Sequence, residues 1–490
     1  MDPLLHALAA WKPPRVLVLG DFMLDQLIYG DAERLSPDAP VPILHARRTD
    51  NRPGGAANVC LDLAALHASV IAFGVVGADP NARALRDALD AASIDTRGLI
   101  DDPARPTTVK QSLIGLAQAR HPQKMFRVDF ESREPLSADA EQRLVDALER
   151  ALPDCDVVCI EDYAKGVCTP SVCRRVIDAA RAARKPVLVD PARGVDYARY
   201  HGATAITPNR TEAEEATALS TAGLNSVEAA EPLARALLDR LALDACILTL
   251  DRHGALLLER GHAPIGVPTR ARQVYDVTGA GDMFLAALAA ARANNLSWFD
   301  STRFANAAAG LEVEVFGVQP IPLEAVHHSL LASGAHGKLR TLDQARVEVA
   351  ALRAAGKRVV FTNGCFDILH SGHVALLDKA AAEGDFLIVG LNSDDSVRRL
   401  KGPTRPVNSQ DDRARVLGAL ASVGAVVVFD DDTPLALIDA LRPDVLVKGA
   451  DYTKDQVVGA PLVESYGGRI ALIPLVEGKS TTGTIHRLRG

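Results

Sequence analysis

Short apolar runs alternate with longer amphipathic stretches through residues 10–320. The runs are nearly continuous in apolar residues, which is typical of central strands covered on both faces. They lie at 15–19, 70–76, 157–161, 187–190, 203–207 and 245–250. The stretches between them are rich in Ala and Arg and have a helical period. This alternation predicts an α/β fold, a doubly wound parallel sheet with helices on both faces.

Residues 26–48 break this pattern. Pro37, Pro40 and Pro42 divide the segment into short extended pieces. Proline cannot donate a hydrogen bond to a neighbouring strand, so within sheets it is confined to edges, strand starts and bulges. The segment therefore predicts a β lid outside the main sheet.

The pattern loosens at residues 319–338 and then restarts. Thr341 and Gln344 have the spacing of a capping box, which predicts a helix that starts there and stops at Gly356. An apolar strand at 358–362 then opens a smaller, Rossmann-like α/β region. We expect three segments along the chain. They are a first domain at 1–330, a linker and connecting helix at 331–356, and a second domain at 357–490.

Chain length and net charge limit the number of domains and the kinds of partner to expect. The 490 residues exceed the roughly 250 to 300 that one hydrophobic core supports, which agrees with two domains. A net charge of −8 argues against general binding to nucleic acid or acidic membranes and favours small-molecule partners. The N-terminus lacks a signal-peptide pattern, and no segment offers about 18 uninterrupted apolar residues, so we expect a cytoplasmic protein.

Cysteine spacing favours thiols over disulfides. The seven cysteines form no C-x-x-C pair, which suits reduced thiols in the cytosol. A zinc site among the cysteines at 155, 159, 168 and 173 is the weaker alternative, because no histidine has a supporting spacing.

The string D-V-T-G-A-G-D at Asp276–Asp282 is the first candidate for chemistry. Gly279, Ala280 and Gly281 precede a helical pattern, so their backbone N–H groups can form an anion hole at the positive end of the helix dipole. Asp282 places a carboxylate beside that hole, where a base for phosphoryl transfer to a hydroxyl is needed. The alternative is a glycine-rich turn with an aspartate cap.

Other polar residues follow the predicted strands. Gly54 and Gly55 allow a ligand to approach the backbone, and Asn58 can bind hydroxyls; close helix packing is the alternative for this string. Further polar strings stand at 162–166, 190–191, 209–212 and 251–254, and each alone suits a turn or a cap. Because parallel strands end at one edge of the sheet, we expect these strings together to surround a ligand.

The second region carries N-G-C-F-D-I-L-H-S-G-H, with His370 and His373 at the expected start of a helix. Two imidazoles and a helix N-terminus can bind a triphosphate. Zinc is the alternative, although H-x-x-H lacks further ligands. A second phosphate-binding helix start is expected at 478–484, G-K-S-T-T-G-T. A phosphate nucleophile is already anionic and needs no base, so positioning and charge neutralisation suffice.

Residues 10–320 resemble the ribokinase-like sugar kinases of the PfkB family through G-G-A-A-N at 54–58, N-x-x-E at 209–212 and D-x-x-G-A-G-D at 276–282. The resemblance implies that Asp282 is the catalytic base and that Gly279, Ala280 and Gly281 form the anion hole. It implies an ATP site of Asn209, Arg210, Thr211, Glu212, Asp251, Gly254 and Asn306, with Glu212 holding Mg²⁺ indirectly. It implies a sugar site of Asp21, Gly54, Gly55 and Asn58. A monovalent cation is a further candidate cofactor.

Residues 357–490 are similar to the cytidylyltransferase-like nucleotidyltransferases through H-x-G-H at His370–His373. The implied ATP-binding residues are Asn363, Gly364, Phe366, His370, His373, Lys448, Ser480, Thr481 and Thr482. The order of the two domains is similar to that of the bifunctional heptose 7-phosphate kinases and heptose 1-phosphate adenylyltransferases of lipopolysaccharide-core synthesis. This similarity implies ATP, Mg²⁺ and sugar phosphates as ligands.

Several choices stay open. The cations that would hold the sugar phosphate are candidates without a ranking: Lys110, Arg120, Lys124, Arg127 and Lys165. Those for the transferase phosphates include Lys401, Arg405 and Lys448. A homodimer through edge strands at 26–48 and 108–128 is a hypothesis. The alternative functions are a generic sugar kinase fused to a cytidylyltransferase that uses CTP, and a ligand sensor built on a kinase fold.

Overall fold

The computed structural model describes residues 4, 7–8, 11–116, 122–221, 227–269, 274–315, 317–332, 338–354, 356–450 and 453–474. The chain divides into two compact units. The first unit is Lys12–Leu323, and the second is Glu324–Gly490 together with Met1–Trp11.

The first unit is built on a nine-stranded sheet in the order β13-β12-β11-β10-β9-β8-β1-β4-β5. Its strands are β1 Arg15–Gly20, β4 Ser69–Gly77, β5 Asp95–Asp102, β8 Val157–Glu161, β9 Val187–Asp190, β10 Ala205–Ile206, β11 Ala245–Thr249, β12 Ala255–Glu259 and β13 Ile265–Val267. The strand pairings are parallel from β11 to β5, and among the described strands of this sheet only the β11–β12 and β12–β13 pairings are antiparallel. The doubly wound sheet predicted from the apolar runs is confirmed.

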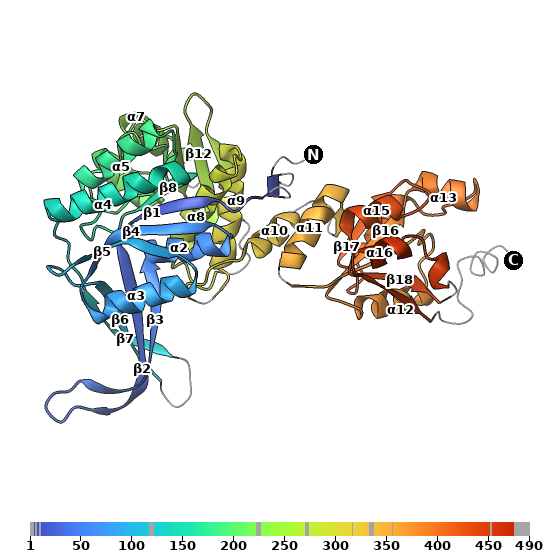
Figure 1. The fold of residues 1–490 in the computed structure, drawn as a ribbon, viewed down its shortest axis with the longest axis horizontal. Helices are drawn as coiled ribbons and strands as arrows, with labels where there is room; N and C mark the ends of the chain where they lie inside the picture. Colours follow the sequence, from blue (N-terminus) through green and yellow to red (C-terminus); the bar gives the residue numbers. More distant parts are fainter. Residues whose placement is uncertain are drawn as a thin grey trace. The chain divides into compact units, whose positions relative to one another are not determined.

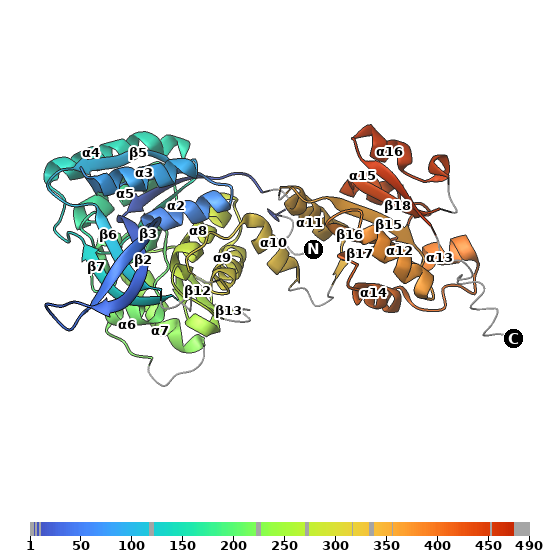
Figure 2. The same cartoon turned by 90° about the horizontal axis from the view of Figure 1, so that it is seen from below.

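Helices cover both faces of this sheet (Figures 1 and 2). They are α2 Ala56–Ala65, α3 Pro80–Ala91, α4 Ala138–Ala151, α5 Pro170–Ala182, α6 Arg210–Thr217, α7 Glu231–Arg240, α8 Ala280–Ala293 and α9 Trp298–Glu312. Short 3₁₀ turns lie at η1 Leu152–Asp154, η2 Tyr197–Tyr200, η3 Glu228–Ala230 and η4 Asp251–His253. Helices α4, α5 and α7 share one core with the sheet, whereas α8 packs between α2 and α9. Because α8 is apolar on nearly all sides, it is buried along most of its length.

A separate four-stranded sheet forms the lid (Figure 1). Its strands are β2 Phe22–Leu35, β3 Pro42–Gly55, β6 Thr108–Gly115 and β7 Gln123–Phe130, in the order β3-β2-β6-β7. The long β2 and β3 pair as an antiparallel hairpin, and β2 pairs with β6 in parallel. The predicted lid at 26–48 is therefore the outer part of this hairpin.

The second unit holds a six-stranded parallel sheet in the order β14-β17-β16-β15-β18-β19. Its strands are β14 Leu339–Arg340, β15 Val359–Gly364, β16 Phe386–Asn392, β17 Ala425–Phe429, β18 Val445–Gly449 and β19 Arg469–Ile473. Its helices are α10 Leu323–Ala332, α11 Leu342–Ala354, α12 Ser371–Ala381, α13 Asp394–Lys401, α14 Gln410–Gly418, α15 Leu435–Leu441 and α16 Ala460–Ser465, with a 3₁₀ turn at η5 Lys454–Gln456. One core joins α11, α15 and α16 to the sheet, and another joins α12 and α14 to its opposite face.

Two local features prepare the sites. The predicted capping box before α11 is confirmed, because the Thr341 N–H donates to Gln344 Oε1 at 2.9 Å and the Gln344 N–H donates to Thr341 Oγ1 at 3.3 Å. The strand order of the second unit reverses at β15, so the carboxyl ends of β15 and its neighbours are the expected binding edge. Among the described residues, no helix has both the length and the apolar character to cross a membrane.

Candidate active sites

Helix α8 starts at a glycine that its surroundings require. Gly279, the N-cap, has φ of 92°, a value that side chains rarely adopt. A Cβ there would also lie 2.6 Å from Glu312 Oε1. The first turn of α8 follows directly and carries Asp282, which is buried. The backbone predicted as an anion hole and the predicted base therefore share one helix N-terminus.

Two side chains from distant segments hold Asp282. Asn58 on α2 donates from Nδ2 to Asp282 Oδ2 at 2.9 Å, and the Tyr163 hydroxyl donates to Oδ1 at 2.8 Å. Tyr163 follows β8 in a string that the sequence marked only as polar punctuation, so its role was missed. Asn58 was expected to bind sugar hydroxyls, and the structure places its amide on the carboxylate of Asp282, the predicted base.

Asp282 has the acidity that a base needs near neutral pH. Burial raises its pKa to about 6, against the lowering effects of the Asn58 and Tyr163 hydrogen bonds and of the Lys110 charge. A general base works best when its pKa is near the working pH. The carboxyl group is thus ionised at pH 7 and can still accept a proton.

Asp282 belongs to a cluster of carboxyl groups. Oxygen atoms of Glu161, Asp190 and Asp282 all lie within 4.8 Å of one another. Burial, followed by the charges of neighbouring carboxylates, raises the pKa values of Glu161 and Asp190 well above the usual range. Within the described part of the chain, Glu161 Oε2 has no hydrogen-bond partner. The group contains no cysteine or histidine, and it is the arrangement among the described residues that could hold a divalent cation.

A second pair of carboxyl groups lies behind the base. Asn58 Nδ2 is 3.5 Å from Asp62 Oδ2, and Glu312 lies against Gly279. Burial, with the charge of Asp282 next, raises the pKa of Glu312 to about 8. The carboxyl group of Glu312, next to the predicted base, is therefore mostly protonated at neutral pH.

Two other residues predicted to face the sugar, Asp21 and Gly55, lie near the start of β2. Asp21 is buried and accepts N–H bonds from Tyr163, Lys165 and Val167 at 2.9, 3.0 and 3.2 Å, so it fixes the loop that carries Tyr163. Gly55 has φ of 56°, and a Cβ on it would lie 2.6 Å from the Asp21 carbonyl. The glycine therefore packs closely against the junction between β1 and β2.

The predicted nucleotide residues form a contiguous edge. Asn209 and Glu212 are a capping box for α6: the Asn209 N–H donates to Glu212 Oε2 at 2.9 Å, and the Glu212 N–H donates to Asn209 Oδ1 at 3.0 Å. Arg210 and Thr211 lie in the same first turn. Asn209 forms an isolated β-bridge with Thr249. Asp251 is the first residue of η4, and Gly254 is the residue that caps the end of this turn. Asn306 on α9 donates to the Val267 carbonyl at 3.1 Å.

The candidate cations differ in their partners. Lys165 pairs with Glu131, and Arg127 pairs with Asp129 at 2.8 Å. Lys124 is exposed, and Arg120 lies outside the described residues. Lys110 has its Nζ 5.1 Å from the centre of the Tyr163 ring and lowers the pKa of Asp282. Among the described candidate cations, Lys110 is therefore the one that the structure links to Asp282 and Tyr163.

The transferase motif gathers at the end of β15. Asn363 and Gly364 end the strand, and Phe366 follows with φ of 44°. His370 is the N-cap of α12, and its ring stacks on His373 with centres 3.9 Å apart. The Phe366 ring meets His373 edge-on at 5.2 Å. Burial and the nearby His370 lower the pKa of His373 to about 4, so His373 is neutral at pH 7.

Neighbouring basic residues complete this edge. Lys448, near the end of β18, donates from Nζ to the Asn363 carbonyl at 3.2 Å, so it borders the motif. Arg405 pairs with Asp367, and Lys401 is exposed at the end of α13. Ser480, Thr481 and Thr482 lie outside the described residues.

Comparisons with known proteins agree with both units. Residues 14–325 match the pfkB family of carbohydrate kinases, and residues 361–472 match the Cytidylyltransferase-like family. The chain is 47% identical over 494 residues to the Bifunctional protein HldE of Caulobacter vibrioides, covering 99% of each chain. It is 46% identical over 477 residues to the protein of that name from Geobacter sulfurreducens, covering 96% of this chain and 95% of the relative.

Solved structures match the first unit in fold. Arabidopsis thaliana ribokinase complexed with ribose and ATP has a TM-score of 0.50 at 23% identity and covers 65% of this chain and 99% of its own. Phosphofructokinase-2 from Escherichia coli in complex with potassium has a TM-score of 0.52 at 17% identity and covers 65% of this chain and 98% of its own. At these identities the likeness concerns the fold alone.

Proposed function

Since the chain belongs to the family of bifunctional HldE proteins, we propose that its two units catalyse two ATP-dependent reactions on one sugar. The first unit phosphorylates O1 of D-glycero-β-D-manno-heptose 7-phosphate to give the 1,7-bisphosphate. The second unit transfers AMP from ATP to heptose 1-phosphate and gives ADP-heptose and pyrophosphate for lipopolysaccharide-core synthesis. A separate phosphatase removes the 7-phosphate between the two steps. Both reactions draw on ATP, and we place them in the cytoplasm.

The observation that carries the kinase proposal is the buried Asp282 beside the glycine-rich start of α8. The O1 hydroxyl gives its proton to Asp282 as its oxygen attacks the γ-phosphorus, and ADP leaves. The N–H groups of Gly279, Ala280 and Gly281 stabilise charge on the transferred phosphoryl group. Asn58 and Tyr163 orient the base. A positioned base contributes roughly 10²- to 10⁴-fold to the rate.

Both reactions imply Mg²⁺, and the first unit has side chains that fit it. The orphaned Oε2 of Glu161 points to a missing partner, and hard carboxylate oxygens are the ligands that Mg²⁺ prefers. Glu161 and Asp190 would hold the ion, with Glu212 at one remove, and the bound ion would neutralise phosphate charge. A requirement for a monovalent cation stays a prediction, which assays in potassium-free buffer test.

The transferase proposal rests on the stacked His370 and His373 at the N-terminus of α12. The phosphate of heptose 1-phosphate attacks the α-phosphorus of ATP, the α–β bridging bond breaks, and pyrophosphate leaves. The nucleophile carries no proton that must be removed at neutral pH, so the site needs donors and cations instead of a base. The imidazoles, the first N–H groups of α12 and Lys448 supply them.

Phosphorus NMR tests both reactions on the full chain. Incubation with ATP, Mg²⁺ and heptose 7-phosphate should produce an anomeric phosphate signal and ADP, whereas ribose, fructose and fructose 6-phosphate should not. Incubation with heptose 1-phosphate should release pyrophosphate with ATP and not with CTP. Turnover of another sugar, or a preference for CTP, would favour a generic kinase fused to a cytidylyltransferase. No turnover of any acceptor would favour a ligand sensor.

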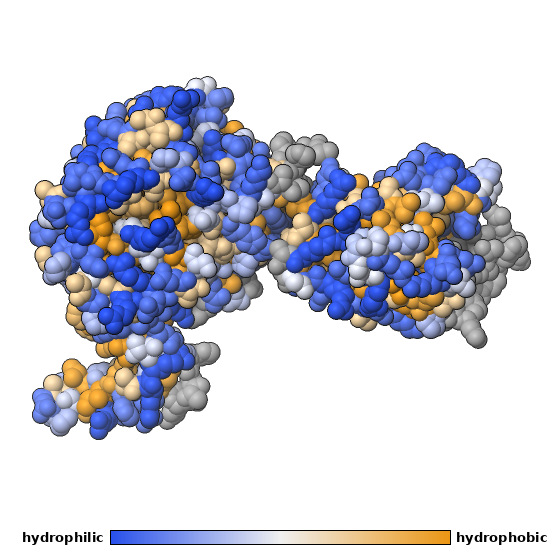
Figure 3. Space-filling view, viewed as in Figure 1, coloured by the Kyte–Doolittle hydropathy of each residue, from blue (hydrophilic) through white to orange (hydrophobic). Residues whose placement is uncertain are grey.

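We also propose that the chain forms a homodimer through its lid. Phe126 and Phe130 on β7, an edge strand of the lid, are 66% and 50% exposed, and Leu35 at the hairpin tip is 65% exposed. Figure 3 shows apolar residues over the lid. An open edge with exposed aromatic residues is a surface suited to pairing with a second copy. Light scattering should give a dimer mass, and a Phe126→Lys variant should shift it toward the monomer.

A further inference from the structure

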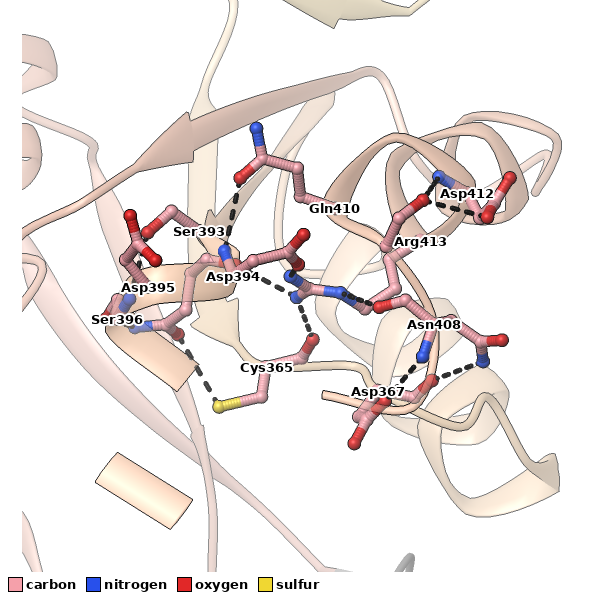
Figure 4. Close-up of polar contacts among 12 residues, drawn as sticks. Cys365, Asp367, Ser393, Asp394, Asp395, Ser396, Asn408, Gln410, Asp412 and Arg413 are labelled. Carbon is pink, nitrogen blue, oxygen red and sulfur yellow. Dashed lines mark hydrogen bonds and ion pairs between the residues drawn. The ribbon is translucent and has the colours of Figure 1, made fainter. Parts of the chain in front are cut away.

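A single buried guanidinium joins the segments that border the transferase site. Arg413 on α14 has a side chain that is 1% exposed. It donates to the carbonyls of Cys365 at 2.6 Å, Asn392 at 2.9 Å and Asn408 at 3.1 Å, and to the carboxylate of Asp394 at 2.7 Å (Figure 4). These partners lie after β15, at the end of β16, at the start of α13 and in the loop before α14. Arg413 therefore ties together the carboxyl ends that line the site.

A buried carboxylate holds the same loop from the other side. Asp367 is 2% exposed and accepts N–H bonds from Val407 at 2.7 Å and Asn408 at 3.2 Å, besides its ion pair with Arg405. Its carbonyl accepts from Asn408 Nδ2 at 2.7 Å. Asn408 is thus bonded to Asp367 through two donors and to Arg413 through its carbonyl. Bonds to Asp367 and to Arg413 therefore hold the segment 405–408 in place.

The contact with Cys365 reaches the histidines. Cys365 precedes Phe366, whose positive φ is costly for a side chain of this size and persists only where the surroundings enforce it. The Phe366 ring packs on His373, and His373 stacks on His370. A bond to the Cys365 carbonyl therefore supports the turn that places both imidazoles.

Packing of α14 does not explain why the side chain of Arg413 is buried. Ala414 and Leu417 seat this helix in the apolar core. A buried ion pair is on balance a weak source of stability, because desolvation offsets the attraction. The hydrogen bonds of Arg413 are instead directed to the turn, the strand end and the loop around the site.

We propose that Arg413, acting with Asp367 and Asn408, is a positioning residue for adenylyl transfer. It fixes the N-G-C-F turn, the end of β16 and the 405–408 segment relative to one another. The imidazoles of His370 and His373 are thereby held where they can bind the triphosphate during the reaction. This inference rests on the adenylyltransferase activity proposed above.

The test compares Arg413→Met with Arg415→Met, a change of the same kind at an exposed position of the same helix. In Arg413→Met, we expect kcat for adenylyl transfer to fall about 100-fold, because an error of about 1 Å in placement costs that much. The KM for ATP should change much less, and millimolar guanidinium should partly restore kcat. Arg415→Met should match the parent chain, and sugar phosphorylation by the same molecules should be unchanged in both.

Asn408→Ala keeps the test decisive if Arg413→Met fails to fold. Asn408 is exposed, so the core does not depend on its side chain. We expect kcat to fall about tenfold, since the hydrogen bond from the Asn408 side chain to the Asp367 carbonyl is lost. Unchanged adenylyl transfer in Asn408→Ala, or a loss in Arg413→Met that matches its unfolded fraction and ignores guanidinium, would overturn the inference. A parent chain that releases no pyrophosphate would instead overturn the proposed function.

Discussion

The two active sites handle charge in opposite ways. In the first unit, the carboxyl groups of Glu161, Asp190 and Asp282 crowd together in a buried place where ionisation is costly. In the second unit, a buried guanidinium, that of Arg413, lies beside the site together with the ion-paired carboxylate of Asp367, and the ring of His373 is kept neutral. Both sites stand at the N-terminus of a helix beyond the carboxyl ends of parallel strands, so the fold does not account for the difference.

The difference follows from the nucleophile. A sugar hydroxyl must lose a proton during attack, and a carboxylate with its pKa raised to about 6 can accept one near neutral pH. A sugar phosphate is already an anion, and a carboxylate beside it would only repel it. A site for the first reaction therefore needs a tuned base, whereas a site for the second needs donors held in place.

Loss of the base should separate the two activities most strongly. In Asp282→Asn we expect the kinase kcat to fall by roughly 10²- to 10⁴-fold, because the amide cannot take the proton. Adenylyl transfer by the same chain should be unchanged. Coupled assays of ADP and pyrophosphate release measure both, with Asp178→Asn, an exposed position on α5, as the control. Retention of full kinase activity would rule out Asp282 as the base.

His373→Ala is the reciprocal change. We expect adenylyl transfer to fall by roughly 10²- to 10³-fold, the usual cost of one lost donor to a developing charge, with the kinase unaffected. Because the pKa of His373 is lowered to about 4, its protonation is lost as pH rises through about 4. The pH profile of the parent transferase should therefore show no limb from this ring between about pH 5 and pH 8. A limb near pH 6.5 that disappears in the variant would contradict this.

Tyr163→Phe tests how the base is tuned. The hydroxyl bond stabilises the carboxylate form of Asp282 and lowers its pKa, so its loss should raise that pKa above about 6. The acid limb of kinase kcat/KM should move up by about one pH unit, and kcat should fall about tenfold.

The matched control for Tyr163→Phe is Tyr197→Phe. Tyr197 is buried, and its hydroxyl has no hydrogen-bond partner among the described residues. Removing that hydroxyl should leave both the limb and kcat in place. If the two variants gave the same pH profile, Tyr163 would have no part in tuning the base.

The smallest effect concerns stability. Burial raises the pKa of Glu312 from 4.5 to about 8, so its contribution to stability is full below about pH 4.5 and is lost as pH rises through about 8. Glu312→Gln removes this titration. Between pH 5 and pH 8, the melting temperature of the first unit should drop less in the variant than in the parent, by about 2–4 °C for each kcal/mol of stability that this titration removes. Parallel curves in scanning calorimetry would show that Glu312 does not contribute.

Motifs confined to one helix start were readable from the chain. The D-V-T-G-A-G-D string predicted the start of α8, and Thr341 with Gln344 predicted the start of α11, because capping and glycine conformation depend on neighbours a few residues away. Asn209 and Glu212 show the limit of that reading. Their spacing was recognised as a kinase motif, although it also encodes the capping box that the structure shows.

Contacts between distant segments were not readable. Tyr163 reaches Asp282 across 119 positions, and Arg413 reaches the Cys365 carbonyl across 48. Nothing in the local sequence of either residue marks its partner. The clustering of Glu161 with Asp190 likewise depends on β8 and β9 lying side by side.

By itself, the sequence determined the alternation of strands and helices, the Pro-punctuated lid and the glycine-rich helix starts, because each depends on backbone preferences and on periods of a few residues. The tertiary structure alone decided which polar groups meet at the strand ends. That choice depends on strand order and register, which bring the amide of Asn58 to Asp282 and the guanidinium of Arg413 to three separate carbonyls. Burial in those places then shifts the pKa values on which the chemistry of the first unit depends.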